Sequence, residues 1–278
     1  MPFPDPSSEH PEVARAAETA SEAPPRRSWV EQVMGLPVSV LARGSRARSA
    51  DADDAVQAVY ADLREADRVF SPYRPDSVVS RLGRGELDWD HLDPIVLDVA
   101  DRCRQAKSLT HGLFDATRPD GWWDPSGLVK GWAVERASRH LGRVGALDWC
   151  LNAGGDVTVL CPSGKPFTVG IQDPRDDRRV ATAVPCVSGA VATSGTAARG
   201  AHLYDPGTGR PVTGRWLSVS VRGPSLETAD VLATAAFVAG DRWPDVLAAA
   251  PGYEGLGITA AGALHATAGW SASEGTGQ

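Results

Sequence analysis

The order of apolar patterns along the chain constrains its fold most. Three segments repeat apolar residues at helical spacing: Val56 to Phe70, the stretch that follows Asp93-Pro94, and Ser126 to Leu141. The second begins with an Asp suited to an N-cap and a Pro suited to the first helical position, and Gly142 follows the third as a stop signal. A fourth helix is expected over about Leu226 to Ala239.

Short β-like runs precede and separate these helices. Gly, Pro and Asp turns bound most of them. Strands and helices alternate too irregularly for a doubly wound parallel sheet, so the sequence predicts an α+β fold. The expected strands are Val38 to Ala42, Trp149 to Leu151, Val157 to Cys161, Phe167 to Ile171, Ala190 to Thr193 and Leu217 to Arg222.

One folded unit is expected between two tails. Residues 1–28 carry many Pro, Ser, Glu and Ala and too few large apolar side chains to offset the entropy of ordering, and residues 271–278 are similar. Residues 29–270 show no long repeat and are numerous enough to bury a core, which predicts a single domain. The N-terminus lacks the charged start and apolar stretch of a secretory signal, which predicts a cytoplasmic location.

Charge and composition disfavour several classes of function. The net charge of −7 argues against binding to nucleic acid or to anionic membranes. The longest apolar run, Val231 to Gly240, is far shorter than the roughly 20 residues that cross a bilayer, so no membrane insertion is expected. Common phosphate-loop, zincin, serine-hydrolase and Rossmann motifs are absent. Four cysteines match no paired metal-ligand spacing and are expected to be reduced thiols: Cys103, Cys150, Cys161 and Cys186.

Asp230 and Thr234 form the most informative local pair. They are four residues apart in a predicted helix, so they share one face near its N-terminal turn. Their hard oxygens suit Mg²⁺, which takes one or two protein oxygens and completes its octahedron with water and substrate phosphate. The structural alternative is an acid that favours the helix dipole and a Thr that bonds back to a carbonyl.

Four further segments offer groups that chemistry could use. Asp124 to Trp132 joins a Gly- and Ser-containing turn to a helix start, where free N–H groups can face an anion and Lys130 adds a positive charge. Asn152 to Asp156 would bring backbone close to a ligand, and Phe70 to Ser77 offers an aromatic ring for stacking. His202 can move a proton near neutral pH. Each segment also has a structural explanation, as a tight turn or a surface loop.

Taken in order, these segments resemble the ApbE family of FAD:protein FMN transferases. The resemblance covers roughly Val33 to Gly240, and an ordered set of motifs is far more specific than any one of them. The motifs stand here as Met34 to Pro37, Tyr73 to Ser77, Phe114-Asp115, Asp124 to Gly131, Asn152 to Asp156, Ala192 to Gly195, His202 to Pro211 and Ala229 to Thr234.

The resemblance implies an ApbE-like flavin transferase fold, with mixed or antiparallel sheets and flanking helices. It also implies that Mg²⁺ is held by Asp230, Thr234 and a backbone oxygen of Gly127. FAD would be contacted from the positions of Met34, Tyr73, Leu113, Phe114, Asp115, Asp124, Lys130 and Tyr204.

The predicted reaction transfers the FMN half of FAD to a Thr or Ser hydroxyl of an acceptor protein, with AMP as the leaving group. Such chemistry mainly requires in-line positioning and charge neutralisation, which Mg²⁺ and Lys130 would supply. The hydroxyl needs a base, for which His202 is the first candidate and Asp115 or Asp205 the second. Hydrolysis of FAD to FMN and AMP, or noncatalytic FAD binding and storage, are the alternatives.

Overall fold

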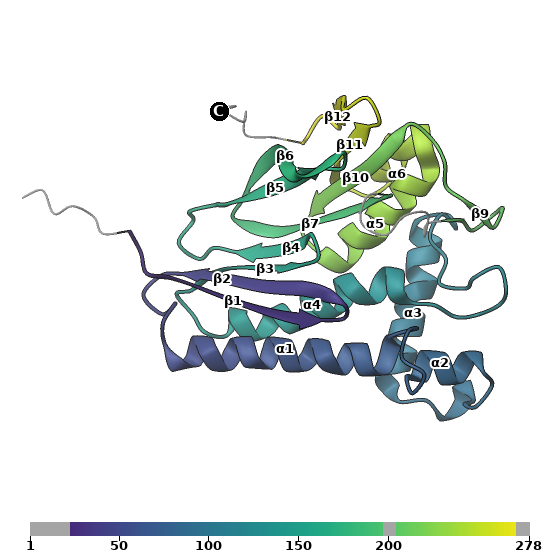
Figure 1. Cartoon of the computed structure of the whole chain (residues 1–278), viewed down its shortest axis with the longest axis horizontal. Helices are drawn as coiled ribbons and strands as arrows, with labels where there is room; N and C mark the ends of the chain where they lie inside the picture. The colour runs from purple at the N-terminus through teal and green to yellow at the C-terminus, as the bar shows by residue number, and fades with distance from the viewer. Residues whose placement is uncertain (1–22, 197–203, 271–278) are drawn as a thin grey trace, which may run out of the picture.

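One large antiparallel sheet organises the molecule (Figure 1). A computed structural model describes residues 23–196 and 204–270. Every strand pair in the large sheet is antiparallel, and its strands lie side by side in the same order as they occur in the sequence. In sheet order they are β1 (Arg26–Val33), β2 (Leu36–Arg43), β3 (Asp148–Ala153), β4 (Asp156–Leu160), β7 (Ser188–Gly195), β10 (Trp216–Gly223), β11 (Glu254–Thr259) and β12 (Leu264–Ala266).

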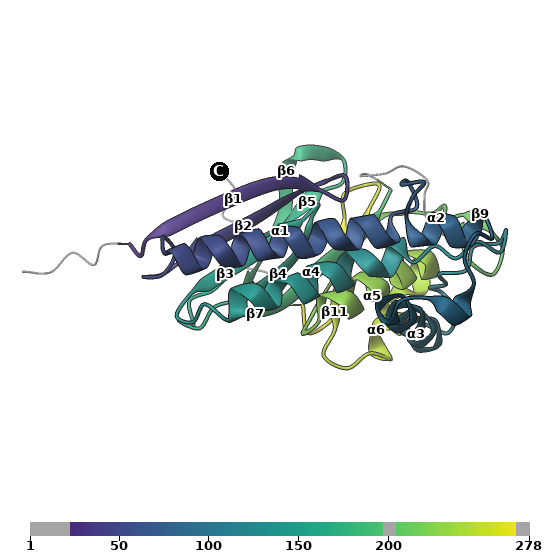
Figure 2. The same cartoon turned by 90° about the horizontal axis from the view of Figure 1, so that it is seen from below.

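Helices cover one face of this sheet. Helix α4 lies between α1 and α5, as Figure 2 shows from below, and α5 packs on β7 and β10. The main apolar core lies between these helices and the sheet. The helices are α1 (Ala50–Phe70), α2 (Val78–Gly83), α3 (Pro94–Leu109), α4 (Ser126–Gly142), α5 (Leu226–Ala239) and α6 (Trp243–Ala248).

Local signals explain why the long helices begin where they do. Ser49 caps α1 by accepting from the Ala52 N–H at 3.2 Å. Asp93 caps α3 by accepting from the Ile95 N–H at 3.1 Å, with Pro94 in the first turn as expected. The apolar stripes expected for α1 and α4 are buried. In α3, Val96 and Cys103 are buried, whereas Ala100, which follows Val96 at helical spacing, is half-buried. Helix α5 has the bounds that the sequence predicts.

A β-hairpin covers the other face of the sheet. Strands β5 (Phe167–Asp173) and β6 (Asp176–Cys186) pair with each other and enclose a second, smaller apolar core against β4, β7 and β11. Two very short strands, β8 (Tyr204–Asp205) and β9 (Arg210–Pro211), form a separate ribbon. The helices and antiparallel sheets confirm the predicted α+β fold.

The structure corrects one boundary of the predicted tail. Strand β1 begins at Arg26 and pairs along its whole length with β2, so residues 26–28 belong to the folded region. Polar and charged residues dominate this strand, and half of its positions are exposed. The composition of residues 26–28 therefore resembled that of the tail before them. The rest of both predicted tails, residues 1–22 and 271–278, lies outside the described residues. No helix within the described part is long and apolar enough to cross a membrane.

Candidate active site

A cleft of about 820 Å³ opens where α4 and α5 begin, beside the ends of β7 and β10 and under the β5–β6 hairpin. This volume lies within the range of about 300–1,000 Å³ that is typical of small-molecule sites. The cleft brings together residues from sequence segments that are far apart. Nine of the predicted site residues line it: Leu113, Phe114, Asp115, Asp124, Gly127, Lys130, Tyr204, Asp230 and Thr234.

Three other predicted residues are placed differently. Met34 lies in the β1–β2 turn with a positive φ of 56° and packs against the main core, while its neighbour Leu36 lines the cleft. Tyr73 is 87% exposed and is not part of the cleft lining. His202 lies outside the described residues.

Two buried carboxylates share one ammonium group at the floor of the cleft. Asp156 and Asp230 are only 1% and 2% exposed. The Lys130 Nζ forms an ion pair with Asp156 Oδ2 and lies 3.4 Å from Asp230 Oδ1. The Thr193 N–H donates to Asp156 Oδ1 at 3.2 Å, and the Gly131 N–H donates to Asp230 Oδ2 at 3.1 Å. These contacts join α4, α5, β4 and β7 in one polar cluster.

The electrostatics of this cluster favour a further cation. Burial, together with the nearby Asp156 carboxylate, raises the pKa of Asp230, and Lys130 and the Gly131 N–H only partly oppose that effect. Two acids against one ammonium leave an excess of negative charge in a buried place, which is costly unless a cation or a proton compensates it.

Hard oxygen ligands are available for such a cation. Ser225 caps α5 by accepting from the Thr228 N–H. Further along this helix, Asp230 and Thr234 are four residues apart and therefore lie on one face. The Thr234 Oγ1 lies 3.0 Å from the Ser194 Oγ, at the edge of the cleft. No group of three or more His, Cys, Asp or Glu side chains among the described residues is arranged to hold a metal ion. One carboxylate, one hydroxyl and the Gly127 carbonyl still match the donor chemistry of Mg²⁺, which keeps several water or phosphate ligands.

The turn before α4 is shaped by close packing. The Asp124 Oδ1 accepts from the Ser126 N–H at 3.1 Å, and the Asp124 N–H donates to the Ala116 carbonyl at 2.7 Å. A side chain on Gly127 would place its Cβ 3.1 Å from the Phe114 ring. Glycine at this position therefore allows the ring and the helix start to meet at the cleft wall.

The two acidic candidates for a base differ in their surroundings. Asp115 lines the cleft, forms an ion pair with Lys107 at 2.6 Å and accepts from the Thr117 N–H at 2.8 Å. Asp205 instead closes its own turn, because its carboxylate accepts from the Gly207 N–H at 2.8 Å and the Thr208 Oγ1 at 3.1 Å. Asp115 is thus the better placed of the two to face a substrate.

Several residues of the cleft were not among the predicted site residues. Asp156 and Ser194 lie in two of the ordered sequence motifs, but their partners, Lys130 and Thr234, come from other elements. Residues 170–177 of the β5–β6 hairpin also line the cleft, and no local sequence signal marked them.

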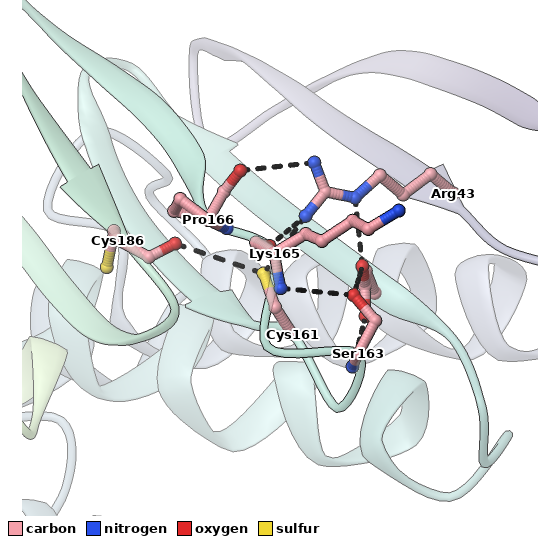
Figure 3. Close-up of polar contacts among 7 residues, drawn as sticks. Arg43, Cys161, Ser163, Lys165, Pro166 and Cys186 are labelled. Carbon is pink, nitrogen blue, oxygen red and sulfur yellow. Dashed lines mark hydrogen bonds and ion pairs between the residues drawn. The ribbon is translucent and has the colours of Figure 1, made fainter. Parts of the chain in front are cut away.

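A buried arginine anchors the base of this hairpin (Figure 3). The Arg43 Nε donates to Asp148 Oδ2 at 2.9 Å, and its Nη atoms donate to the carbonyls of Lys165 and Pro166. The Ser163 Oγ donates to the same Asp148 oxygen at 2.6 Å. The loop that enters β5 is therefore tied to β2 and β3, which supports the hairpin wall of the cleft.

Comparison with known proteins agrees with this geometry. The model of the ApbE family matches residues 34–120 and 118–256. A FAD:protein FMN transferase of Vibrio cholerae serotype O1 is 34% identical over 134 residues, which cover 44% of this chain and 40% of that protein. A FAD:protein FMN transferase of Haemophilus influenzae is 28% identical over 165 residues, covering 55% and 45%. The matches span less than half the length of these curated relatives.

Solved structures share the fold. The ApbE protein of Thermotoga maritima superposes with a TM-score of 0.77 at 24% identity, covering 88% of this chain and 97% of that one. The flavin transferase ApbE of Vibrio cholerae superposes with a TM-score of 0.71 at 23% identity, covering 90% and 98%. Because the family model matches most of the chain and the fold is shared, this chain belongs to the ApbE family.

Proposed function

We propose that this chain is an Mg²⁺-dependent FAD:protein FMN transferase, which attaches FMN to a Thr or Ser hydroxyl of an acceptor protein and releases AMP. The observation that carries the proposal is the cluster of Lys130, Asp156 and Asp230 at the floor of a cleft large enough for a nucleotide. The names of the curated relatives support the transfer of FMN from FAD to a protein.

FAD would occupy the cleft with its pyrophosphate near the start of α4. The ammonium of Lys130, which Asp156 holds at the floor, offers positive charge to the phosphate oxygens. Asp230, Thr234 and the Gly127 carbonyl would hold Mg²⁺, which supplies charge neutralisation to the pyrophosphate when bound. Leu113 and Phe114 offer apolar surface at the cleft wall for the flavin or the adenine ring.

The reaction exchanges one phosphorus–oxygen bond for another. The hydroxyl oxygen of the acceptor forms a bond to the FMN phosphorus, and the bond from that phosphorus to the bridging oxygen breaks. AMP leaves with the bridging oxygen, and the hydroxyl proton passes to a base. His202 is the proposed base, with Asp115 second because its carboxylate lines the cleft.

The test is to incubate the purified chain with FAD and Mg²⁺, with and without a peptide that carries a Thr, and to follow AMP and the peptide mass. AMP release with an FMN-sized gain in peptide mass is the expected result. AMP with free FMN would instead indicate a hydrolase, and bound but intact FAD would indicate a storage protein. A His202→Ala variant that transfers FMN at the wild-type rate would remove His202 as the base.

A further inference from the structure

Glu135 reaches from α4 to the start of α5. Its Oε2 accepts from the Ser225 Oγ at 2.7 Å and from the Glu227 N–H at 3.0 Å. Ser225 is the N-cap of α5, and its Oγ in turn accepts from the Thr228 N–H at 3.3 Å. One carboxylate oxygen of α4 therefore orients the N-cap residue of α5 and satisfies one of the N–H groups that a helix start leaves without a partner.

The relative placement of α4 and α5 determines the geometry of the proposed site. Helix α4 carries Gly127 and Lys130, and α5 carries Asp230 and Thr234. The two helices meet at Gly131, where an added Cβ would lie 2.9 Å from the Leu226 carbonyl oxygen and 3.0 Å from the Asp230 Cβ. A shift of one helix along the other would therefore change every distance between these groups.

Glu135 is suited to hold that placement. It lies about one helical turn beyond Gly131 on α4, so the close contact at Gly131 and the polar contact at Ser225 fix two successive points along the same pair of helices. A carboxylate at the N-terminus of α5 also interacts favourably with the helix dipole.

Water and small solutes have access to Glu135. It lines a pocket of about 250 Å³ between α3 and α4, together with Arg136 and Arg139. Removing its side chain would therefore leave space that a small carboxylate can enter from solvent. This access makes the contribution of the carboxylate separable from that of the rest of the fold.

We propose that Glu135 is a positioning residue, whose carboxylate sets the first turn of α5 and thereby the register of Asp230 and Thr234 against Lys130. The inference rests on the proposed function, because those residues form the proposed Mg²⁺ and pyrophosphate site. Glu135 touches neither FAD nor the metal in this proposal.

The test compares Glu135→Ala and Glu135→Gln with Arg139→Ala, a control on the same helix and in the same pocket. Hydrogen exchange is followed by mass spectrometry in the peptide over residues 225–234, and FAD turnover is measured against Mg²⁺ concentration. In Glu135→Ala, we expect faster hydrogen exchange at the start of α5. The Mg²⁺ concentration that gives half-maximal FAD turnover, here called the Mg²⁺ constant, should rise about tenfold, and the turnover rate at saturating Mg²⁺ should change less. Glu135→Gln keeps an oxygen acceptor and should stay close to wild type, as should Arg139→Ala.

Added acetate provides the decisive readout. Acetate at millimolar concentration should restore slow exchange and the Mg²⁺ constant of Glu135→Ala, whereas sodium chloride at the same ionic strength should not. Wild-type exchange or a wild-type Mg²⁺ constant in Glu135→Ala would overturn the proposal. If that variant does not fold, Ser225→Ala removes the hydroxyl that donates to Glu135 and is held to the same exchange and Mg²⁺ criteria, except that acetate should not rescue it because its carboxylate is intact.

The two proposals fail in different ways. A wild-type chain that does not turn over FAD would refute the proposed function. The exchange comparison, with and without acetate, would still decide whether Glu135 sets the start of α5.

Discussion

Gly131→Ala tests the contact at which α4 and α5 meet. An Ala Cβ at this position would lie 2.9 Å from the Leu226 carbonyl oxygen, 3.0 Å from the Asp230 Cβ and 3.1 Å from the Glu227 Cα. Two of these atoms belong to the backbone of α5, so no side-chain rotation relieves the crowding. The helices must separate by a few tenths of an ångström, and the hydrogen bond from the Gly131 N–H to Asp230, now 3.1 Å, must lengthen.

Two opposing effects determine how much the free energy of unfolding of Gly131→Ala changes. Overpacking of a closely packed interior costs roughly 1–3 kcal/mol. Alanine is the better helix former by about 1 kcal/mol. The free energy of unfolding of Gly131→Ala should therefore fall by roughly 0–2 kcal/mol. Gly142, at the last position of the same helix, has no atom within 4 Å of its added Cβ, so Gly142→Ala should gain up to about 1 kcal/mol.

Urea denaturation of the two variants, followed by circular dichroism, measures this difference. The second consequence concerns the proposed Mg²⁺-dependent FAD turnover. If Asp230 holds the metal as proposed, its displacement should raise the Mg²⁺ requirement of Gly131→Ala, whereas Gly142→Ala should keep the wild-type requirement. Equal stability and equal Mg²⁺ dependence in the two variants would refute the reasoning that Gly131 is needed for close approach of the helices.

Three further changes have distinct expected outcomes. Asp230→Asn should lower the proposed Mg²⁺-dependent FAD turnover about 100-fold, because it removes the carboxylate of the proposed metal site. The urea midpoint should stay close to wild type, because one of two neighbouring buried acids is removed, and intact turnover would refute the metal assignment. Arg43→Ala leaves Asp148 buried without its guanidinium partner and should lower the free energy of unfolding by roughly 3–5 kcal/mol in urea denaturation, and a loss below about 1 kcal/mol would contradict this. Burial raises the pKa of Cys103 and of Cys150 to about 12, so iodoacetamide at pH 8 should label both thiols only after denaturation, and mass spectrometry of the native protein would reveal any exception.

Sequence periodicity was most reliable where structure is local. The apolar stripe of α1 and the cap of α3 follow from neighbours within a few residues, and α5 has its predicted bounds. Strand β1 was missed because a sheet-edge strand with exposed polar residues is stabilised by its pairing with β2 rather than by its own composition. Strand β6 was also not among the expected strands. Most of its positions are exposed, and it too is stabilised by pairing, in this case with β5.

The sequence by itself determined that Asp230 and Thr234 share one helical face, because that relation depends only on helical spacing. The order of its motifs also identified the family. Only the tertiary structure decided that Lys130 pairs with Asp156, which comes from β4, and that the Gly131 N–H meets Asp230, 99 residues away in the chain. Such contacts depend on how helices and strands pack in three dimensions. The order and spacing of residues along the chain do not show which distant groups this packing brings into contact.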